Sequence, residues 1–195
     1  MDKKNVLYEA LMNRGKILSK KQIMSIMHEY DKELKKIKEE NLLKYLSRHN
    51  YIRRIFSEFY YINSYDERNR NFSELEDKEV VFIVLNKLGI NWYLGLGSSL
   101  YFQGKTWQTP NQISIINNKF SGIKKIFGIK VKFFKIKENL IFGLKKAQTK
   151  HTTYFYSDPA KTYIDLVYFR ATPNLIKIKN TQEYLKKYPK WIGKK

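Results

Sequence analysis

Two short β-prone runs separated by only two residues are the feature that most restricts the fold of this chain. Residues 51–56 (YIRRIF) and 59–62 (FYYI) are rich in aromatic and β-branched side chains, and Ser57 and Glu58 stand between them. Such a short connection predicts an antiparallel hairpin. Three segments with helical periodicity precede it, so the order is helix, helix, helix, hairpin. This order is typical of a winged helix-turn-helix and predicts that domain over residues 1–63.

The clearest helix start in the chain is at Ser19. It stands three residues before Gln22, which is the spacing of a capping box. The apolar residues that follow have the i, i+3, i+4, i+7 spacing of a buried helix face: Ile23, Ile26, Met27 and Tyr30. A third helix is predicted from about residue 33 to residue 49, with its leucines toward the core.

The opposite face of the third helix carries side chains that suit the major groove of DNA: Lys38, Asn41, Lys44, Tyr45 and Arg48. Arginine can bond guanine and asparagine can bond adenine, while lysine neutralises phosphate. The predicted DNA-binding set also takes in the first turn of the second helix and the hairpin, with Lys20, Lys21, Arg53 and Arg54. The alternative interpretation is an ordinary solvated helix face.

A polar segment of mixed charge, residues 64–72, predicts a linker between two differently charged halves. Residues 1–75 hold 16 basic and 11 acidic side chains, and residues 76–195 hold 22 basic and 7 acidic ones. The formal net charge of +20 indicates a polyanionic partner. Lysine used only for solubility is the alternative.

Residues 73–195 are predicted to form a mixed α/β domain, which makes the whole chain α+β. Ser73 and Glu76 have capping-box spacing ahead of an apolar run that predicts a buried helix. The segments that follow predict a strand, glycine turn and helix (92–104), strands (112–116, 129–136 and 151–156), a helix started by Asp158 and Pro159, and a last helix (181–188).

Lysines alternate with apolar and aromatic residues along the predicted strand 129–136, and further lysines flank it. This arrangement is typical of proteins that bind single-stranded nucleic acid. The predicted basic surface consists of Lys119, Lys124, Lys125, Lys130, Lys132 and Lys135. A half-buried strand with a lysine-rich outer face would have the same pattern, and both interpretations stay open.

Residue types that catalysis needs are scarce. The chain has no cysteine, and its three histidines lie far apart, which argues against thiol chemistry and a zinc site. Gly97 and Ser98 resemble the opening of a nucleotidyltransferase fold, but no paired carboxylates follow to hold magnesium. We therefore expect a non-enzymatic protein without catalytic residues, metal or cofactor. A degenerate transferase is the enzymatic alternative.

The start of the chain lacks the apolar core of a signal peptide. No apolar run approaches the ~20 residues that a membrane-spanning helix needs. We therefore expect a cytoplasmic protein.

Taken in order, the hairpin-bearing half and the segments LGSSLYFQG, TPNQISIINNKFSGIKKIFGIKVKFF and YFYSDPAKTYIDLVYF resemble the AbiEi-type antitoxins of type IV toxin–antitoxin systems. The resemblance covers nearly the whole chain and rests chiefly on residues 92–170. The residues in the family's pattern are Gly97, Ser98, Ser157, Asp158, Pro159 and Asp165. The chain departs from that pattern in a Lys/Glu-rich insert at 31–40 and in a wing without glycine.

The resemblance implies an N-terminal domain that binds inverted repeats in promoter DNA and represses its own operon. It implies a C-terminal domain that is needed to neutralise a nucleotidyltransferase-like toxin. The residues themselves leave a second function open, which is RNA binding through the basic C-terminal domain.

Overall fold

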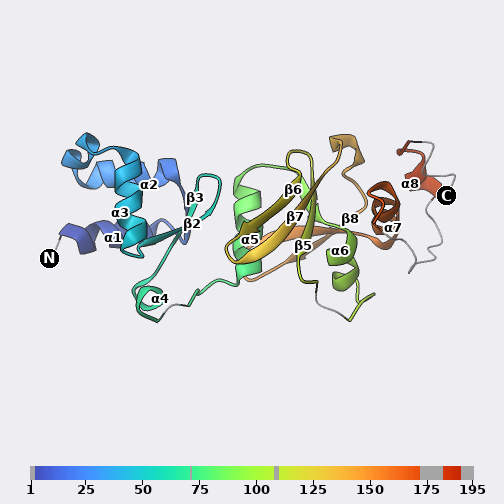
Figure 1. Ribbon diagram of the computed structural model, residues 1–195, viewed down its shortest axis with the longest axis horizontal. Helices are drawn as coiled ribbons and strands as arrows, with labels where there is room; N and C mark the ends of the chain where they lie inside the picture. Colours follow the sequence, from blue (N-terminus) through green and yellow to red (C-terminus); the bar gives the residue numbers. More distant parts are fainter. Residues whose placement is uncertain (1–2, 71, 108–109, 172–181, 190–195) are drawn as a thin grey trace. The chain divides into compact units, whose positions relative to one another are not determined.

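The computed structural model describes residues 3–70, 72–107, 110–171 and 182–189 (Figure 1). The chain is a mixed α+β protein with two compact units, Met1–Val84 and Leu85–Lys195, here called unit 1 and unit 2. The boundary between them falls inside helix α5 (Asp77–Lys87).

Unit 1 combines helices with a three-stranded antiparallel sheet of order β1-β3-β2. Before α5 its elements are α1 (Lys3–Asn13), β1 (Ile17–Ser19), α2 (Lys20–Tyr30), the 3₁₀ helix η1 (Lys32–Lys36), α3 (Glu39–Arg48), β2 (Ile52–Phe56), β3 (Phe59–Ile62) and α4 (Tyr65–Arg70). Side chains from α1, α2, α3 and the sheet share one core, which includes Leu11, Ile23, Leu46 and Ile62.

Two local predictions for unit 1 are confirmed. The hairpin of β2 and β3 forms with the two-residue connection at Ser57 and Glu58. Both bonds of the capping box are present, because the backbone N–H of Gln22 donates to Ser19 Oγ and the N–H of Ser19 donates to Gln22 Oε1. The predicted buried stripe of α2 is shorter than expected, since Tyr30 in its last turn is 50% exposed.

The third helix begins later than its pattern predicts. Asp31 caps the short η1 helix by accepting the N–H of Glu33, and Ile37 and Lys38 then adopt extended backbone. Extended ψ values interrupt the helical hydrogen-bond ladder, so α3 starts only at Glu39.

The prediction of a linker at residues 64–72 is wrong in its structure and in its boundary. This segment contains α4, and Glu67 in that helix is buried. The compact units divide at Val84 and Leu85 instead. A buried carboxylate needs several donors, and unit 1 supplies them, which ties α4 to unit 1.

Unit 2 is built on a mixed sheet of order β6-β7-β5-β4-β9-β8. After α5 its elements are β4 (Trp92–Leu94), α6 (Leu96–Phe102), β5 (Ile113–Asn117), β6 (Gly122–Ile126), β7 (Ile129–Lys135), the 3₁₀ helix η2 (Glu138–Leu140), β8 (Leu144–Gln148), β9 (Thr153–Ser157), α7 (Pro159–Tyr168) and α8 (Gln182–Leu185). Pairs β5–β7 and β4–β9 are parallel, and the other neighbours are antiparallel.

The helices α6 and α7 of unit 2 pack on a shared core with one face of the sheet. That face carries Tyr93, Ile116 and Phe134, which cluster with Leu96 of α6 and Ile164 of α7. Gly95 at the start of α6 is required by close packing, because a Cβ atom there would lie 2.3 Å from Ile116 Cδ1. This contact accounts for the glycine at the strand-to-helix turn.

Several predicted elements of unit 2 are confirmed, and some were missed. The strand β4, the helix α6, the strands β5, β7 and β9, and the Asp158-capped α7 follow the sequence pattern. The edge strands β6 and β8 were not predicted. The helix α5 forms, but Ser73 does not cap it: its Oγ accepts a hydrogen bond from Arg53.

Candidate nucleic-acid interface

One side of α3 is fixed in the core, and the other side is open. Leu42, Leu43 and Leu46 are buried, which orients the helix. The exposed residues on the opposite side, here called the α3 face, are Asn41, Lys44, Tyr45 and Arg48. Residues with this i, i+3, i+4, i+7 spacing lie along one helix face. The structure thus brings four of the predicted DNA-binding side chains together, and Lys38 is exposed just before the helix.

Tyr45 is held in place on the α3 face by a ring contact. Its ring lies 4.4 Å from the ring of His49, centroid to centroid, and the planes are tilted by 52°. Tyr45 is still 40% exposed. A ring that already packs against a neighbour loses less rotamer entropy on binding than a free one does.

Of the two lysines predicted to bind DNA at the start of α2, Lys20 has a carboxylate partner within the chain. Its Nζ lies 2.8 Å from Glu39 Oε2 at the start of α3. The hydrogen bond with Glu39 raises the pKa of Lys20, and the same bond lowers the pKa of Glu39. Lys21 is exposed. The structure therefore leaves Lys21 available, while a phosphate at Lys20 would compete with Glu39.

The two hairpin arginines have different surroundings. Arg54 is exposed, and its guanidinium donates to the carbonyl of Ser57 from Nε and NH2 at 3.2 and 3.0 Å. These bonds hold Arg54 at the turn that joins β2 and β3.

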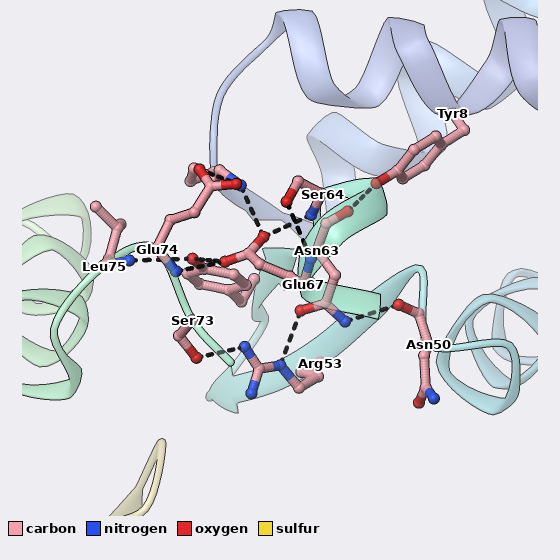
Figure 2. A network of polar contacts seen from close by, with 11 residues as sticks. Tyr8, Asn50, Arg53, Asn63, Ser64, Glu67, Ser73, Glu74 and Leu75 are labelled. Carbon is pink, nitrogen blue, oxygen red and sulfur yellow. Dashed lines mark hydrogen bonds and ion pairs between the residues drawn. The ribbon is translucent and has the colours of Figure 1, made fainter. Parts of the chain in front are cut away.

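Arg53, which was predicted to contact DNA, is instead engaged inside unit 1 (Figure 2). Its Nε donates to Asn63 Oδ1 at 2.9 Å, and its NH2 donates to Ser73 Oγ at 2.7 Å. The guanidinium also lies 5.0 Å from the ring centroid of Tyr61. Arginine has a planar fork of donors, and here the fork bridges β2 to residues 63 and 73. We therefore remove Arg53 from the DNA-binding set.

The contacts of Arg53 belong to a polar network centred on Glu67 (Figure 2). The buried carboxylate of Glu67 accepts hydrogen bonds from Lys16 Nζ at 2.7 Å and from Tyr61 OH at 2.5 Å. It also accepts the backbone N–H groups of Ser64 and Glu74. Burial raises the pKa of Glu67, but these four donors outweigh burial and lower the pKa to about 2.

The predicted basic surface of unit 2 is divided between two faces of the sheet. In the β6–β7 register, Lys125 is opposite Lys130 and Ile123 is opposite Lys132. Opposite residues share a face, and so do alternate residues of one strand. These four residues, here called the β6–β7 lysine face, lie on the same side as Phe134. Lys124 and Lys135 lie on the other side, and Lys119 is exposed in the β5–β6 turn.

The residues that carry the resemblance to AbiEi-type antitoxins lie at structural positions of unit 2. Ser98 Oγ accepts the N–H of Ser114, and Ser157 Oγ is hydrogen-bonded to Thr162 Oγ1. Asp158 caps α7 through the N–H of Lys161, with Pro159 as its first residue. Gly97 lies in α6 with open space around its Cα. These hydrogen bonds tie α6 to β5 and β9 to α7.

A buried ion pair in unit 2 was missed at the level of sequence. Lys161 Nζ lies 2.5 Å from Asp165 Oδ1, and both side chains are fully buried. Tyr93 OH donates to Asp165 Oδ2 at 2.8 Å, and Tyr188 OH contacts both charged groups. The i, i+4 spacing of Lys161 and Asp165 was the available signal, but it is also typical of exposed helix pairs.

The described ranges contain neither a cluster that could bind a metal ion nor a helix that could cross a membrane. They hold no cluster of three or more His, Asp or Glu side chains that could bind a metal ion. Among the helices of those ranges, none is long and apolar enough to cross a membrane.

In comparisons with known proteins, the chain matches no family model and no curated protein.

Proposed function

We propose that unit 1 is a winged helix-turn-helix domain that binds duplex DNA, with α3 in the major groove. The element order α1-β1-α2-α3-β2-β3 and the sheet order β1-β3-β2 support this proposal. The single observation that carries it is the α3 face, where Asn41, Lys44, Tyr45 and Arg48 are exposed together. Arg54 at the β2–β3 turn and Lys21 at the start of α2 are suited to contact the flanking phosphates.

Replacing Arg48 by alanine should weaken binding to the operator by about 1–3 kcal/mol, if Arg48 reads a base. This corresponds to roughly a 5- to 150-fold increase in Kd. The measurement is a gel-shift titration of the full chain against the DNA upstream of its own gene, which should contain inverted repeats. Affinity should also fall steeply as salt increases.

Arg14 provides a matched control for Arg48. It is an arginine of the same unit with a 65% exposed side chain at the end of α1, so Arg14→Ala removes the same charge away from the α3 face. We expect Arg14→Ala to change operator affinity by less than about twofold, because Arg14 is not on α3 and its exposed ion pair with Glu29 is a weak interaction. Equal losses for both variants, or no binding to upstream DNA at low salt, would contradict the proposal.

We further propose, on the resemblance to AbiEi-type antitoxins, that the chain represses its own operon and neutralises a nucleotidyltransferase-like toxin. The test is co-expression with the adjoining reading frame. If that frame encodes a toxin with paired carboxylates, its expression should stop growth, and the full chain should restore growth. Growth arrest that the full chain does not relieve would refute the antitoxin role and leave DNA binding untouched.

A further inference from the structure

We propose that the β6–β7 lysine face, formed by Ile123, Lys125, Lys130 and Lys132, binds the phosphodiester backbone of single-stranded nucleic acid. This site is separate from the α3 face and goes beyond the proposed DNA-binding function of unit 1.

The three lysines of this face repel one another. Lys125 and Lys130 are directly opposite each other on adjacent antiparallel strands, and Lys132 follows on the same face. Like charges directly opposite destabilise a sheet. A single edge lysine would be enough to discourage aggregation, so protection of an edge does not account for three lysines on one face.

Carboxylates of unit 2 do not compensate these charges. Residues 88–137 contain no Asp or Glu. The four carboxylates of unit 2 lie on other elements: Glu138 accepts from Asn91, Asp158 caps α7, Asp165 pairs with Lys161, and Glu183 lies on α8. The positive potential is therefore left for an external anion.

An exposed apolar residue, Ile123, lies among the lysines. Ile123 is 55% exposed and is opposite Lys132. The Nζ atom of Lys132 lies 5.0 Å from the ring centroid of Phe134, which holds this lysine against the sheet. A duplex turns its phosphates outward and keeps its bases stacked, so Ile123 would gain no contact from it. An unpaired strand offers base faces beside its phosphates, which suits an apolar side chain between lysines.

The test compares two triple variants with the same loss of charge. Lys125→Gln/Lys130→Gln/Lys132→Gln removes the lysines of the proposed site. Lys145→Gln/Lys146→Gln/Lys150→Gln removes three exposed lysines from β8 and the turn after it. Both are made in the full chain with Lys44→Ala/Arg48→Ala, which silences the α3 face. Fluorescence anisotropy then measures binding to 20-nucleotide oligo(U), oligo(dT) and a duplex of equal length.

We expect the first triple variant to weaken binding to both single strands at least tenfold at low salt. The slope of log K against log salt should fall by about 2, since each neutralised phosphate contact on a single strand contributes ~0.7. The β8 triple variant should lose less than threefold. Ile123→Ser should weaken single-strand binding and leave the salt slope and duplex binding unchanged.

Folding of the variants is checked by thermal unfolding. Because the first triple variant removes an opposed lysine pair, its unfolding midpoint should be equal to or higher than that of the parent. Equal losses in both triple variants would overturn the proposal, and so would tighter binding to duplex than to single strands. The first lysine triple variant is also made without the α3 substitutions, and this version should still bind the operator. A failure of the single-strand proposal is therefore distinguishable from a failure of the proposed DNA-binding function.

Discussion

Replacing Lys161 by methionine should lower the free energy of unfolding of unit 2 by about 3–5 kcal/mol, the usual cost of removing one partner of a buried ion pair. Methionine fills the volume of the lysine stem, but it leaves Asp165 as a buried carboxylate with only the hydroxyls of Tyr93 and Tyr188. Burial raises the pKa of Asp165 and lowers the pKa of Lys161, so each charge depends on the other.

The measurement is urea unfolding followed by tryptophan fluorescence. All three tryptophans lie within Leu85–Lys195, and Trp92 is buried in β4, so the signal reports on unit 2. Lys145→Met is the matched control, because Lys145 is exposed on β8, and it should change stability by less than about 0.5 kcal/mol.

A double variant separates the ion pair from general packing. In Lys161→Met/Asp165→Asn no charge is buried, and the amide can accept from one tyrosine hydroxyl through its oxygen and donate to the other through its NH₂ group. We expect the double variant to lose clearly less than the sum of the two single losses, since replacing both partners of a buried pair is often nearly neutral. Additive losses would show that the two groups stabilise the fold independently.

How much of this structure could be predicted depends on whether the signal is local. The capping box at Ser19, the two-residue hairpin and the Asp158–Pro159 helix start involve residues within four positions of each other, and all three are present. β1, a three-residue strand, exists only because Ile17 and Leu18 pair with β3 more than 40 residues later. No periodicity can appear in three residues.

The edge strands of unit 2 were missed for a related reason. β6 (GIKKI) and β8 (LKKAQ) are short and each has two adjacent lysines, so they lack an apolar alternation. Lysine on an edge strand is common because only one side of the strand is paired. β6 and β8 form because they pair with β7 and β9, and the sequence pattern did predict these two partner strands.

The candidate sites, too, could be predicted only where the sequence signal is local. The α3 face was predictable, because the helix period alone sorts Leu42 and Leu46 from Asn41 and Arg48. Strand alternation places the two adjacent hairpin arginines on opposite faces of β2, but it does not reveal which face offers hydrogen-bond acceptors. Their roles are set by Asn63 and Ser73, which supply acceptors to Arg53 only.

Replacing Glu67 by glutamine should destabilise unit 1 by about 2–3 kcal/mol, because hydrogen bonds to a charged group are the stronger ones and a buried donor is left unpaired. The glutamine NH₂ group would face donors such as Lys16 Nζ and the N–H of Ser64. The side chain of Lys16 is 20% exposed and also lies 2.8 Å from Glu74 Oε2, which limits the loss. Hydrogen exchange of peptides covering residues 59–75 measures this effect locally.

The stability of unit 1 should also depend on pH through the carboxylate of Glu67. The folded chain lowers the pKa of Glu67 from its ordinary value of 4.5 to about 2, so the unfolded chain binds more protons between these pH values. The contribution of Glu67 is fully present above pH ~4.5 and is lost as the pH falls toward 2. Wild type and Glu67→Gln should therefore differ in exchange protection at pH 6 and converge at low pH. Glu58→Gln, at the exposed β2–β3 turn, should follow wild type throughout. A constant difference at all pH values would mean that Glu67 acts through its shape and not through its charge.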